Sequence, residues 1–170
     1  MRVFFFGVGY CASRLIAREP WIEASGTARI AERVAALRGD GVEAYAFDGA
    51  RPDPGLERAL HKAEAIVVSI PPRDGTGAAL ETFAATIAAA PALRRVLYYS
   101  TIGVYGDHAG AWIDETSATL TRTIRGLARL EDEARWMAAA RARGVEADIL
   151  RVVPCAELTL RDPFCSDQIR

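Results

Sequence analysis

The chain has 170 residues, of which 51% are hydrophobic and 25% are charged, and its 21 basic and 22 acidic side chains give a formal net charge of −1. This length and apolar content predict one folded domain and exclude an intrinsically disordered chain. The charge balance gives no sign of a nucleic-acid or membrane partner, and no apolar run reaches the length of a membrane span. The cysteines at positions 11, 155 and 165 lack the spacing of a zinc site or a disulfide framework, so we expect no metal and a cytoplasmic location.

Short apolar runs alternate with helical segments along the chain, which is the pattern of βαβ units and a parallel sheet. Strands are expected at residues 3–6, 21–27, 42–47, 65–70, 95–100 and 147–153. Helices are expected at residues 11–18, 29–38, 56–61, 78–90 and 124–143, with a polar loop over residues 101–120. Gly39 is expected to be the C-cap of the second helix. The apolar face of the helix over residues 124–143 is expected to comprise Leu127, Leu130, Ala134 and Met137.

Six strands with five intervening helices predict an α/β fold with a doubly wound parallel sheet of strand order 3-2-1-4-5-6. This Rossmann domain is expected to span residues 1–153, and residues 154–170 are expected to form an irregular tail. Neither an internal repeat nor a linker divides the chain.

A glycine-rich turn lies between the first expected strand and the first helix, with the sequence Gly7-Val8-Gly9-Tyr10-Cys11-Ala12. Such a GxGxxA turn is typical of dinucleotide-binding proteins. Gly7 permits the tight turn, Gly9 lets a pyrophosphate approach, and Ala12 lets helix and strand pack together. The helix N-terminus at Tyr10 and Cys11 offers amide donors to the phosphates. An ordinary tight turn that binds nothing is the alternative.

The end of the second strand reads Gly26-Thr27-Ala28-Arg29. NAD-binding folds usually carry an acidic residue there, which bonds the ribose 2′-hydroxyl. Arg29 instead favours a 2′-phosphate, so NADP is preferred over NAD, with Thr27 as a neighbouring cofactor contact. The alternative is that Arg29 only begins an exposed helix face.

A second motif follows the fifth strand, where Thr101 is followed by Val104-Tyr105-Gly106 and, further on, by Glu115. Together with the glycine turn, these residues resemble the extended short-chain dehydrogenase/reductase family, also called NAD-dependent epimerase/dehydratases, over residues 2–153. The resemblance implies that Asp48 contacts the adenine. It also implies that the turn after the fourth strand lines the cofactor through Ser69, Ile70 and Pro71.

The same resemblance implies that Thr101 is the catalytic hydroxyl and that Glu115 is the acidic residue before the active-site helix. Tyr105 matches a structural tyrosine of the family and is a possible acid, and His108 in the same loop is either an acid–base group or a surface side chain.

The family's Y-x-x-x-K motif is absent, because its two positions fall on Arg125 and Arg129. No tyrosine follows Tyr105, and Lys62, the only lysine, lies before the fourth strand. An arginine cannot shuttle protons at neutral pH, so the usual mechanism cannot operate, and the chain resembles an atypical branch of the family. Arg125 and Arg129, one helical turn apart, could bind a carboxylate or phosphate of the substrate. A solvated face paired with neighbouring acidic residues is equally open.

Family members continue into a small lobe that closes over the substrate, whereas this sequence lacks their Y-G-P-G continuation after residue 153. We therefore expect the C-terminal substrate lobe to be missing, either in a short variant or through a shifted reading frame. The last strand should then be poorly covered, which favours a homo-oligomer or aggregation.

The function expected is that of an NAD(P)-binding oxidoreductase or epimerase-like protein acting on a nucleotide sugar or another polar metabolite. The alternatives are a non-catalytic dinucleotide-binding module or sensor, and a truncated inactive relic.

Overall fold

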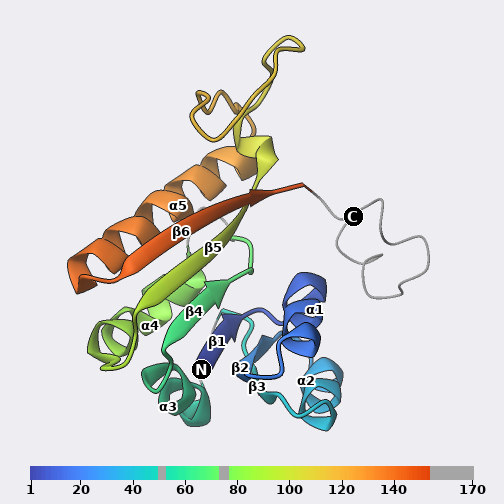
Figure 1. Ribbon diagram of the computed structural model, residues 1–170, viewed down its shortest axis with the longest axis vertical. Coiled ribbons are helices and arrows are strands. Elements are labelled where there is room, and N and C mark those ends of the chain that lie inside the picture. The colour runs from blue at the N-terminus through green and yellow to red at the C-terminus, as the bar shows by residue number, and fades with distance from the viewer. Residues whose placement is uncertain (50–52, 73–76, 154–170) are drawn as a thin grey trace.

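The chain folds into alternating strands and helices, and the computed structural model describes residues 1–49, 53–72 and 77–153 (Figure 1). The strands are β1 (Arg2–Phe6), β2 (Glu23–Ala28), β3 (Glu43–Ala46), β4 (Ala65–Val68), β5 (Arg95–Thr101) and β6 (Glu146–Val152). The helices are α1 (Tyr10–Arg18), α2 (Ala31–Gly39), α3 (Pro54–His61), α4 (Ala78–Ala89) and α5 (Ile124–Arg143), with a short 3-10 turn, η1 (Ile102–Val104).

The strands form one parallel sheet in the order β3-β2-β1-β4-β5-β6. The predicted doubly wound fold and strand order are therefore confirmed. The order reverses between β1 and β4, where Phe5 pairs with Gly26 on one side and with Val67 on the other. All strands end at the same edge, so the turns that follow β1, β4 and β5 lie together at the switch point.

Strand β1 is apolar on both faces because both faces of the sheet are covered there. Phe4 and Phe6 belong to the core under α3, α4 and α5, whereas Val3 and Phe5 belong to the core under α1 and α2 (Figure 1). The Phe6 ring centroid lies 5.5 Å from that of Phe83 and 6.0 Å from that of Trp136. These contacts fix the strand from which the glycine turn departs.

Several predicted boundaries shift by one or two residues. Strand β2 begins at Glu23, since Trp21 is 55% exposed and lies in the preceding turn. Gly39 is not the C-cap of α2 as predicted: it is the last helical residue, Asp40 is the C-cap, and the left-handed φ of +83° falls on Gly41. Because Gly41 takes the reversed conformation, Gly39 has no need of it.

The predicted apolar face of α5 is wrong. Leu127 is 52% exposed and Ala134 is also exposed, while Leu130 and Met137 are only half-buried. The helix instead buries a face made of Gly126, Asp132, Glu133, Trp136 and Ala140. The reason is that polar groups at the ends of β5 and β6 receive the carboxylates of this face, as described below.

Strand β6 forms one edge of the sheet, and its residues alternate between exposed and half-buried. Its half-buried Ala147 and Ile149 pack toward the core under α5. Leu150 and Val152 point to the opposite face and are 43% and 40% exposed. No described helix covers β6 on that face.

The predicted tail at residues 154–170, with Cys155 and Cys165, lies outside the described residues. None of the helices in the described part of the chain is long and apolar enough to cross a bilayer.

Candidate functional site

The glycine turn after β1 is held rigidly by neighbouring strands. Gly7 has a φ of +91°, and a Cβ on it would lie 2.7 Å from Ile70 Cγ2 and 2.8 Å from Ser69 Oγ. Its N–H donates to Thr27 Oγ1 at 2.9 Å, and its carbonyl accepts from Ser69 Oγ at 2.6 Å. Only glycine fits this position, which ties the ends of β1, β2 and β4 together.

Gly9 serves a different purpose, because it is the N-cap of α1. Its φ of −87° suits any residue, and no described atom lies within 4 Å of a Cβ built on it. Among the described residues no side chain caps the helix, so the amides of its first turn lack a side-chain acceptor there. Tyr10 is half-buried and Cys11 exposed beside this space, while Ala12 is 1% exposed and packs into the core. The arrangement suits an anion at the start of α1.

Thr27 lies beneath the turn rather than in front of it. Its side chain is 1% exposed, and its hydroxyl oxygen accepts the hydrogen bond from Gly7. Its carbonyl accepts from the N–H of Val8 at 2.8 Å. The structure thus places Thr27 next to the predicted cofactor site, where it supports the turn.

Two arginines follow β2. Arg29, the residue predicted to meet a 2′-phosphate, is exposed directly after the strand. Arg33 on α2 is half-buried, and its Nη2 donates to Ser13 Oγ at 2.8 Å and to the carbonyl of Val8 at 3.5 Å. Arg33 was not predicted from the sequence, because its contacts with Ser13 and Val8 exist only in the folded chain.

The turn after β4 forms the other wall of the switch point. The N–H groups of Ser69 and Ile70 donate to the carbonyl of Phe6 at 2.9 and 3.2 Å. Ile70 is half-buried and Pro71 exposed, while Asp48 is exposed at the same edge of the sheet, after β3. Ser69 and Ile70 thus lie against the glycine turn.

Thr101 ends β5 with a half-exposed side chain. Its Oγ1 accepts a hydrogen bond from the N–H of Gly103 at 3.1 Å. That bond uses the oxygen as an acceptor, so the hydroxyl hydrogen can still be donated to a ligand.

Tyr105 is enclosed in a polar cluster between β5, β6 and α5. The side chain is 5% exposed, and its hydroxyl accepts from Arg151 Nη1 at 3.2 Å, with the guanidinium carbon 5.0 Å from the ring centroid. Arg151 Nη2 also donates to Glu133 at 2.9 Å, and Ser100 donates to the same carboxylate. Hydrogen bonding to Glu133 raises the pKa of Arg151 above its ordinary value. The hydroxyl of Tyr105 is therefore hydrogen-bonded inside this cluster and largely shielded from solvent.

Arg125 and Arg129 are not brought together in one anion site. Arg125 is exposed, whereas Arg129 is half-buried and its Nη1 donates to the carbonyl of Tyr99 at 3.0 Å and to the hydroxyl of Tyr98 at 3.1 Å. The same nitrogen lies 3.5 Å from the carbonyl of Ile70. Arg129 therefore joins the ends of β4 and β5 beside the predicted cofactor-lining turn.

The neighbouring Asp132 is 3% exposed, and burial raises its pKa. Its hydrogen bond with Tyr98 and the charges of Arg129 and Arg135 act in the opposite direction and only partly offset the burial. The predicted alternative, a solvated face of charges, therefore does not describe this side of α5.

The loop between η1 and α5 projects past the sheet, beyond the start of α5 (Figure 1). Glu115 is exposed in this loop. His108 is half-exposed, and its Nε2 lies 3.0 Å from the carbonyl of Ala118, which braces the two arms of the loop.

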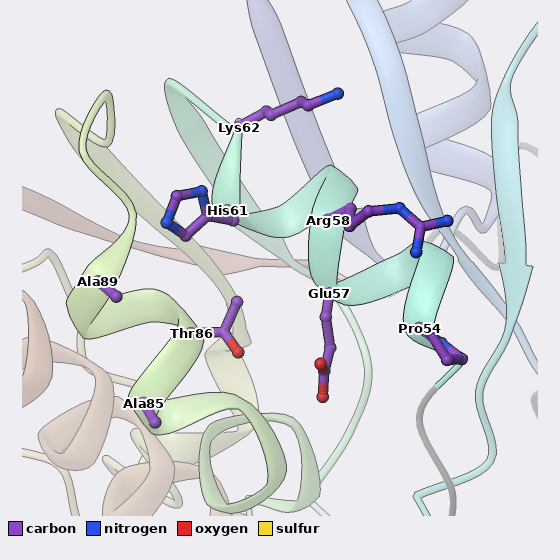
Figure 2. Close-up of a pocket in the computed structure, with 8 residues that line it drawn as sticks. All are labelled: Pro54, Glu57, Arg58, His61, Lys62, Ala85, Thr86 and Ala89. Carbon is purple, nitrogen blue, oxygen red and sulfur yellow. The ribbon is translucent and has the colours of Figure 1, made fainter.

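A shallow groove between α3 and α4 contains no residue of the glycine turn (Figure 2). Its charged side chains, Glu57, Arg58 and Lys62, point in different directions, so they do not converge on a ligand. A second groove lies at the opposite, amino edge of the sheet, beside Arg2, Glu23 and Glu43. Within the described residues, no group of three histidine, cysteine or acidic side chains is placed to hold a metal.

Comparisons with known proteins show which proteins this chain resembles in sequence and fold. No protein-family model matches the sequence, and a search of curated proteins finds no relative. A conserved protein of unknown function from Silicibacter pomeroyi is 32% identical, with a TM-score of 0.75 over 89% of this chain and 51% of that one. A protein from Methylobacillus flagellatus, classed provisionally as an NAD-dependent epimerase/dehydratase, is 26% identical, with a TM-score of 0.68 over 88% and 53% of the two chains.

A more distant neighbour is the UDP-glucuronic acid 4-epimerase of Bacillus cereus, solved in complex with NAD. It is 16% identical, with a TM-score of 0.68 over 90% of this chain and 57% of that chain. The chain spans about half the length of each of these three proteins.

The fold and site define a Rossmann protein with a dinucleotide-type turn. Its structural neighbours are NAD-dependent epimerase/dehydratases and other members of the short-chain dehydrogenase/reductase superfamily. The predicted resemblance to this family is thus confirmed.

Proposed function

We propose that this protein binds NAD(P) at the glycine turn and acts as an oxidoreductase or epimerase-like protein on a nucleotide sugar or another polar metabolite. The observation that carries the proposal is the pairing of a locked Gly7 with an open helix N-terminus at Gly9. Because the two lie at the switch point of the sheet, the amides at the start of α1, which no described side chain caps, are available to a pyrophosphate.

The chain's own residues fit such a cofactor. The start of α1 would hold the pyrophosphate, with Asp48 toward the adenine and Ser69, Ile70 and Pro71 along the nicotinamide half. The cofactor supplies hydride transfer when bound. Thr101, at the end of β5, would donate its hydroxyl hydrogen to a substrate oxygen. Arg129 would keep the ends of β4 and β5 at the spacing this requires.

A second candidate function is a non-catalytic dinucleotide-binding module or sensor. It is favoured by the enclosure of Tyr105 and by the arginines at both positions of the missing Y-x-x-x-K motif. An assay of hydride transfer on a panel of nucleotide sugars separates the two, because a module binds cofactor without turnover. A relic without selected function would bind neither cofactor. A cytoplasmic location and self-association are part of the same proposal.

The first experiment is a fluorescence titration with NADPH and NADH. Cofactor at 100 times its Kd should stabilise the fold by about 2.7 kcal/mol, visible as a rise in Tm. Gly9→Val should abolish binding, because its side chain fills the space of the pyrophosphate. Loss of the favourable glycine N-cap should cost the variant no more than about 1 kcal/mol of folding stability.

Gly39→Val is the matched control, since a Cβ there also meets no described atom within 4 Å but lies at the far end of α2. It should leave cofactor affinity unchanged. Unchanged affinity in Gly9→Val, or no binding by the wild-type protein, would refute the proposed site.

A further inference from the structure

We propose that the guanidinium of Arg129 binds a carboxylate on the substrate, so that the substrate is a sugar acid rather than a neutral sugar. This inference rests on the proposed function, because it places a substrate at the carboxyl ends of β4 and β5, beside the cofactor. It adds to that function the chemical class of the sugar and the residue that recognises it.

The hydrogen bonds of Arg129 hold its guanidinium between two walls of the candidate site. Nη1 donates to the carbonyl of Tyr99 at 3.0 Å and to the hydroxyl of Tyr98 at 3.1 Å, both on β5, and lies 3.5 Å from the carbonyl of Ile70 in the turn after β4. The guanidinium carbon also lies 5.7 Å from the centroid of the Tyr98 ring. Because Tyr99 stands shortly before Thr101 on β5, the positive charge is fixed beside the strand end that carries the candidate catalytic hydroxyl.

This positive charge has no anionic partner among the described residues. Arg129 takes part in none of their salt bridges, and the acceptors of its Nη1 are all uncharged oxygens. The charge of Arg129 acts on Asp132, but burial raises the pKa of that carboxyl, which is hydrogen-bonded with Tyr98. A half-buried charge without a partner is costly, so a bound anion would supply the compensation that the described residues do not.

A second half-buried arginine of α5 shows why the position of Arg129 in the helix matters. Arg143 also has no acidic partner among the described residues and donates to the carbonyl of Ala90 at 2.7 Å. It lies in the last turn of α5, where the helix dipole favours a cation. Arg129 lies in the second turn, toward the positive end of the dipole, and gains no such stabilisation. A ligand is therefore the source of anionic charge that its position calls for.

The donors that remain on Arg129 favour a carboxylate. Its contacts all use Nη1, and within the described chain Nε and Nη2 have no acceptor. Two neighbouring guanidinium nitrogens bind a carboxylate through a pair of parallel hydrogen bonds. Thr101 would then hold the reacting oxygen of the sugar while Arg129 holds the carboxylate of the same sugar. The diphosphate of a nucleotide sugar is the other possible source of an anion, and the experiment separates the two.

The test compares the affinities of the cofactor-bound protein for UDP-glucuronate and UDP-glucose, measured by calorimetry. The two ligands differ only at C6, where the first has a carboxylate and the second a hydroxymethyl group. UDP-glucuronate should bind wild type about ten- to a hundredfold more tightly, the gain expected for charge-assisted hydrogen bonds. In Arg129→Gln this ratio should fall to about one. A purely structural role of Arg129 would instead weaken both ligands together and leave the ratio unchanged.

Arg143→Gln is the matched control, since it removes a half-buried arginine of the same helix that also donates to a backbone carbonyl, at the opposite end of α5. It should leave the ratio of the two affinities at its wild-type value. Arg129→Lys keeps the charge but loses the paired donors, so its ratio should lie between those of wild type and Arg129→Gln. If Arg129→Gln does not fold, Arg129→Lys decides the matter, because a wild-type ratio in that variant overturns the inference.

The inference is also overturned if wild type binds the two nucleotide sugars equally or binds neither, or if Arg129→Gln keeps the wild-type ratio. Equal affinities that fall together in Arg129→Gln would assign the guanidinium to the diphosphate instead. Titration with NADPH and NADH in the absence of sugar keeps these outcomes apart from the proposed function, since the cofactor would still bind at the glycine turn. Failure of the wild-type protein to bind either cofactor would refute the proposed function itself.

Discussion

At the scale of single residues, Gly7 and Gly9 differ in whether they can accept a side chain. A Cβ on Gly7 would overlap its neighbours, whereas a Cβ on Gly9 would meet no described atom. Gly7→Ala would place a methyl group against Ile70 and Ser69 while holding alanine at a φ of +91°. We expect this variant to lose about 1–3 kcal/mol of unfolding free energy, because strain and overlap act together. Urea denaturation measures the loss, and cofactor binding should fall with it.

Gly9→Ser is the control for Gly7→Ala. Its φ of −87° and ψ of −164° lie in the extended region that an N-cap serine adopts, and its Cβ meets no described atom. Serine should therefore keep or slightly improve the stability of α1. If Gly7→Ala unfolded at the same urea concentration as wild type, the tight contact with the turn after β4 would be wrong.

The raised pKa of the buried Asp132 carboxyl group leads us to expect that the stability of the protein depends on pH. Burial raises its folded-state pKa, so between its unfolded pKa, about 4, and that higher value the native state keeps a proton that the unfolded chain releases. Its contribution to stability is fully present below pH ~4 and is lost as the pH rises through the folded-state pKa. Asp132→Asn removes this titration.

The measurement is the unfolding free energy of both proteins from pH 4 to pH 8. The advantage of wild type over Asp132→Asn should shrink steadily as the pH rises, because asparagine stays neutral. A difference that grows with pH would mean that Arg129 and Arg135 outweigh burial and hold the carboxylate ionised.

At the scale of elements, the start of α5 depends on one cap. Thr123 Oγ1 accepts from the N–H of Gly126 at 3.0 Å, and this end of the helix precedes the turn that carries Arg129. Thr123→Ala should cost about 1 kcal/mol of unfolding free energy, and Thr123→Ser should restore it. Thr116→Ala, in the exposed loop, removes a similar hydroxyl contact with Asp114 and should change stability by less than about 0.5 kcal/mol. Equal effects of the two alanine variants would show that the cap contributes nothing specific.

The elements also show which features the sequence could predict. The strand order follows from alternating apolar runs and helices, and the glycine turn from a motif of six adjacent residues, so both depend on local patterns. The buried face of α5 does not, because Glu133 is buried by a contact with Arg151, which lies 18 residues away. A count of apolar positions selects Leu127 over Glu133, since only the folded chain brings the carboxylate's partners together.

The residues of the candidate site likewise fall into two groups: those that the spacing of the sequence predicts, and those that only the folded chain brings together. Gly7, Gly9 and Ala12 could be found from spacing, whereas the enclosure of Tyr105 depends on an arginine 46 residues away. Arg33 was missed because its reach to Ser13 spans 20 residues and crosses from one helix to another. Contacts of this kind leave no periodic signal in the sequence.

At the scale of the whole molecule, the two halves of the sheet differ in how they are covered. β1 has helices on both faces, but β6 is an edge strand with Leu150 and Val152 exposed on the face away from α5. Leu150 pairs with Tyr99 and Val152 with Thr101, so this apolar surface adjoins the end of β5 that carries the candidate catalytic hydroxyl. Whatever covers it would also affect access to that hydroxyl.

We therefore expect the protein to self-associate through this surface, since an edge strand that no other described strand pairs, with exposed aliphatic side chains, favours contact with another copy. Sedimentation velocity over a hundredfold range of protein concentration should show a rising average mass. Threonine is β-branched and suits a strand, so replacing Leu150 and Val152 together by threonine removes apolar surface without disfavouring β6, and the association should weaken. Ile124→Gln is the control, because Ile124 is 87% exposed at the start of α5, on a different surface. A monomer at every concentration would contradict the prediction, and weakening by Ile124→Gln alone would move the contact from the sheet edge to α5.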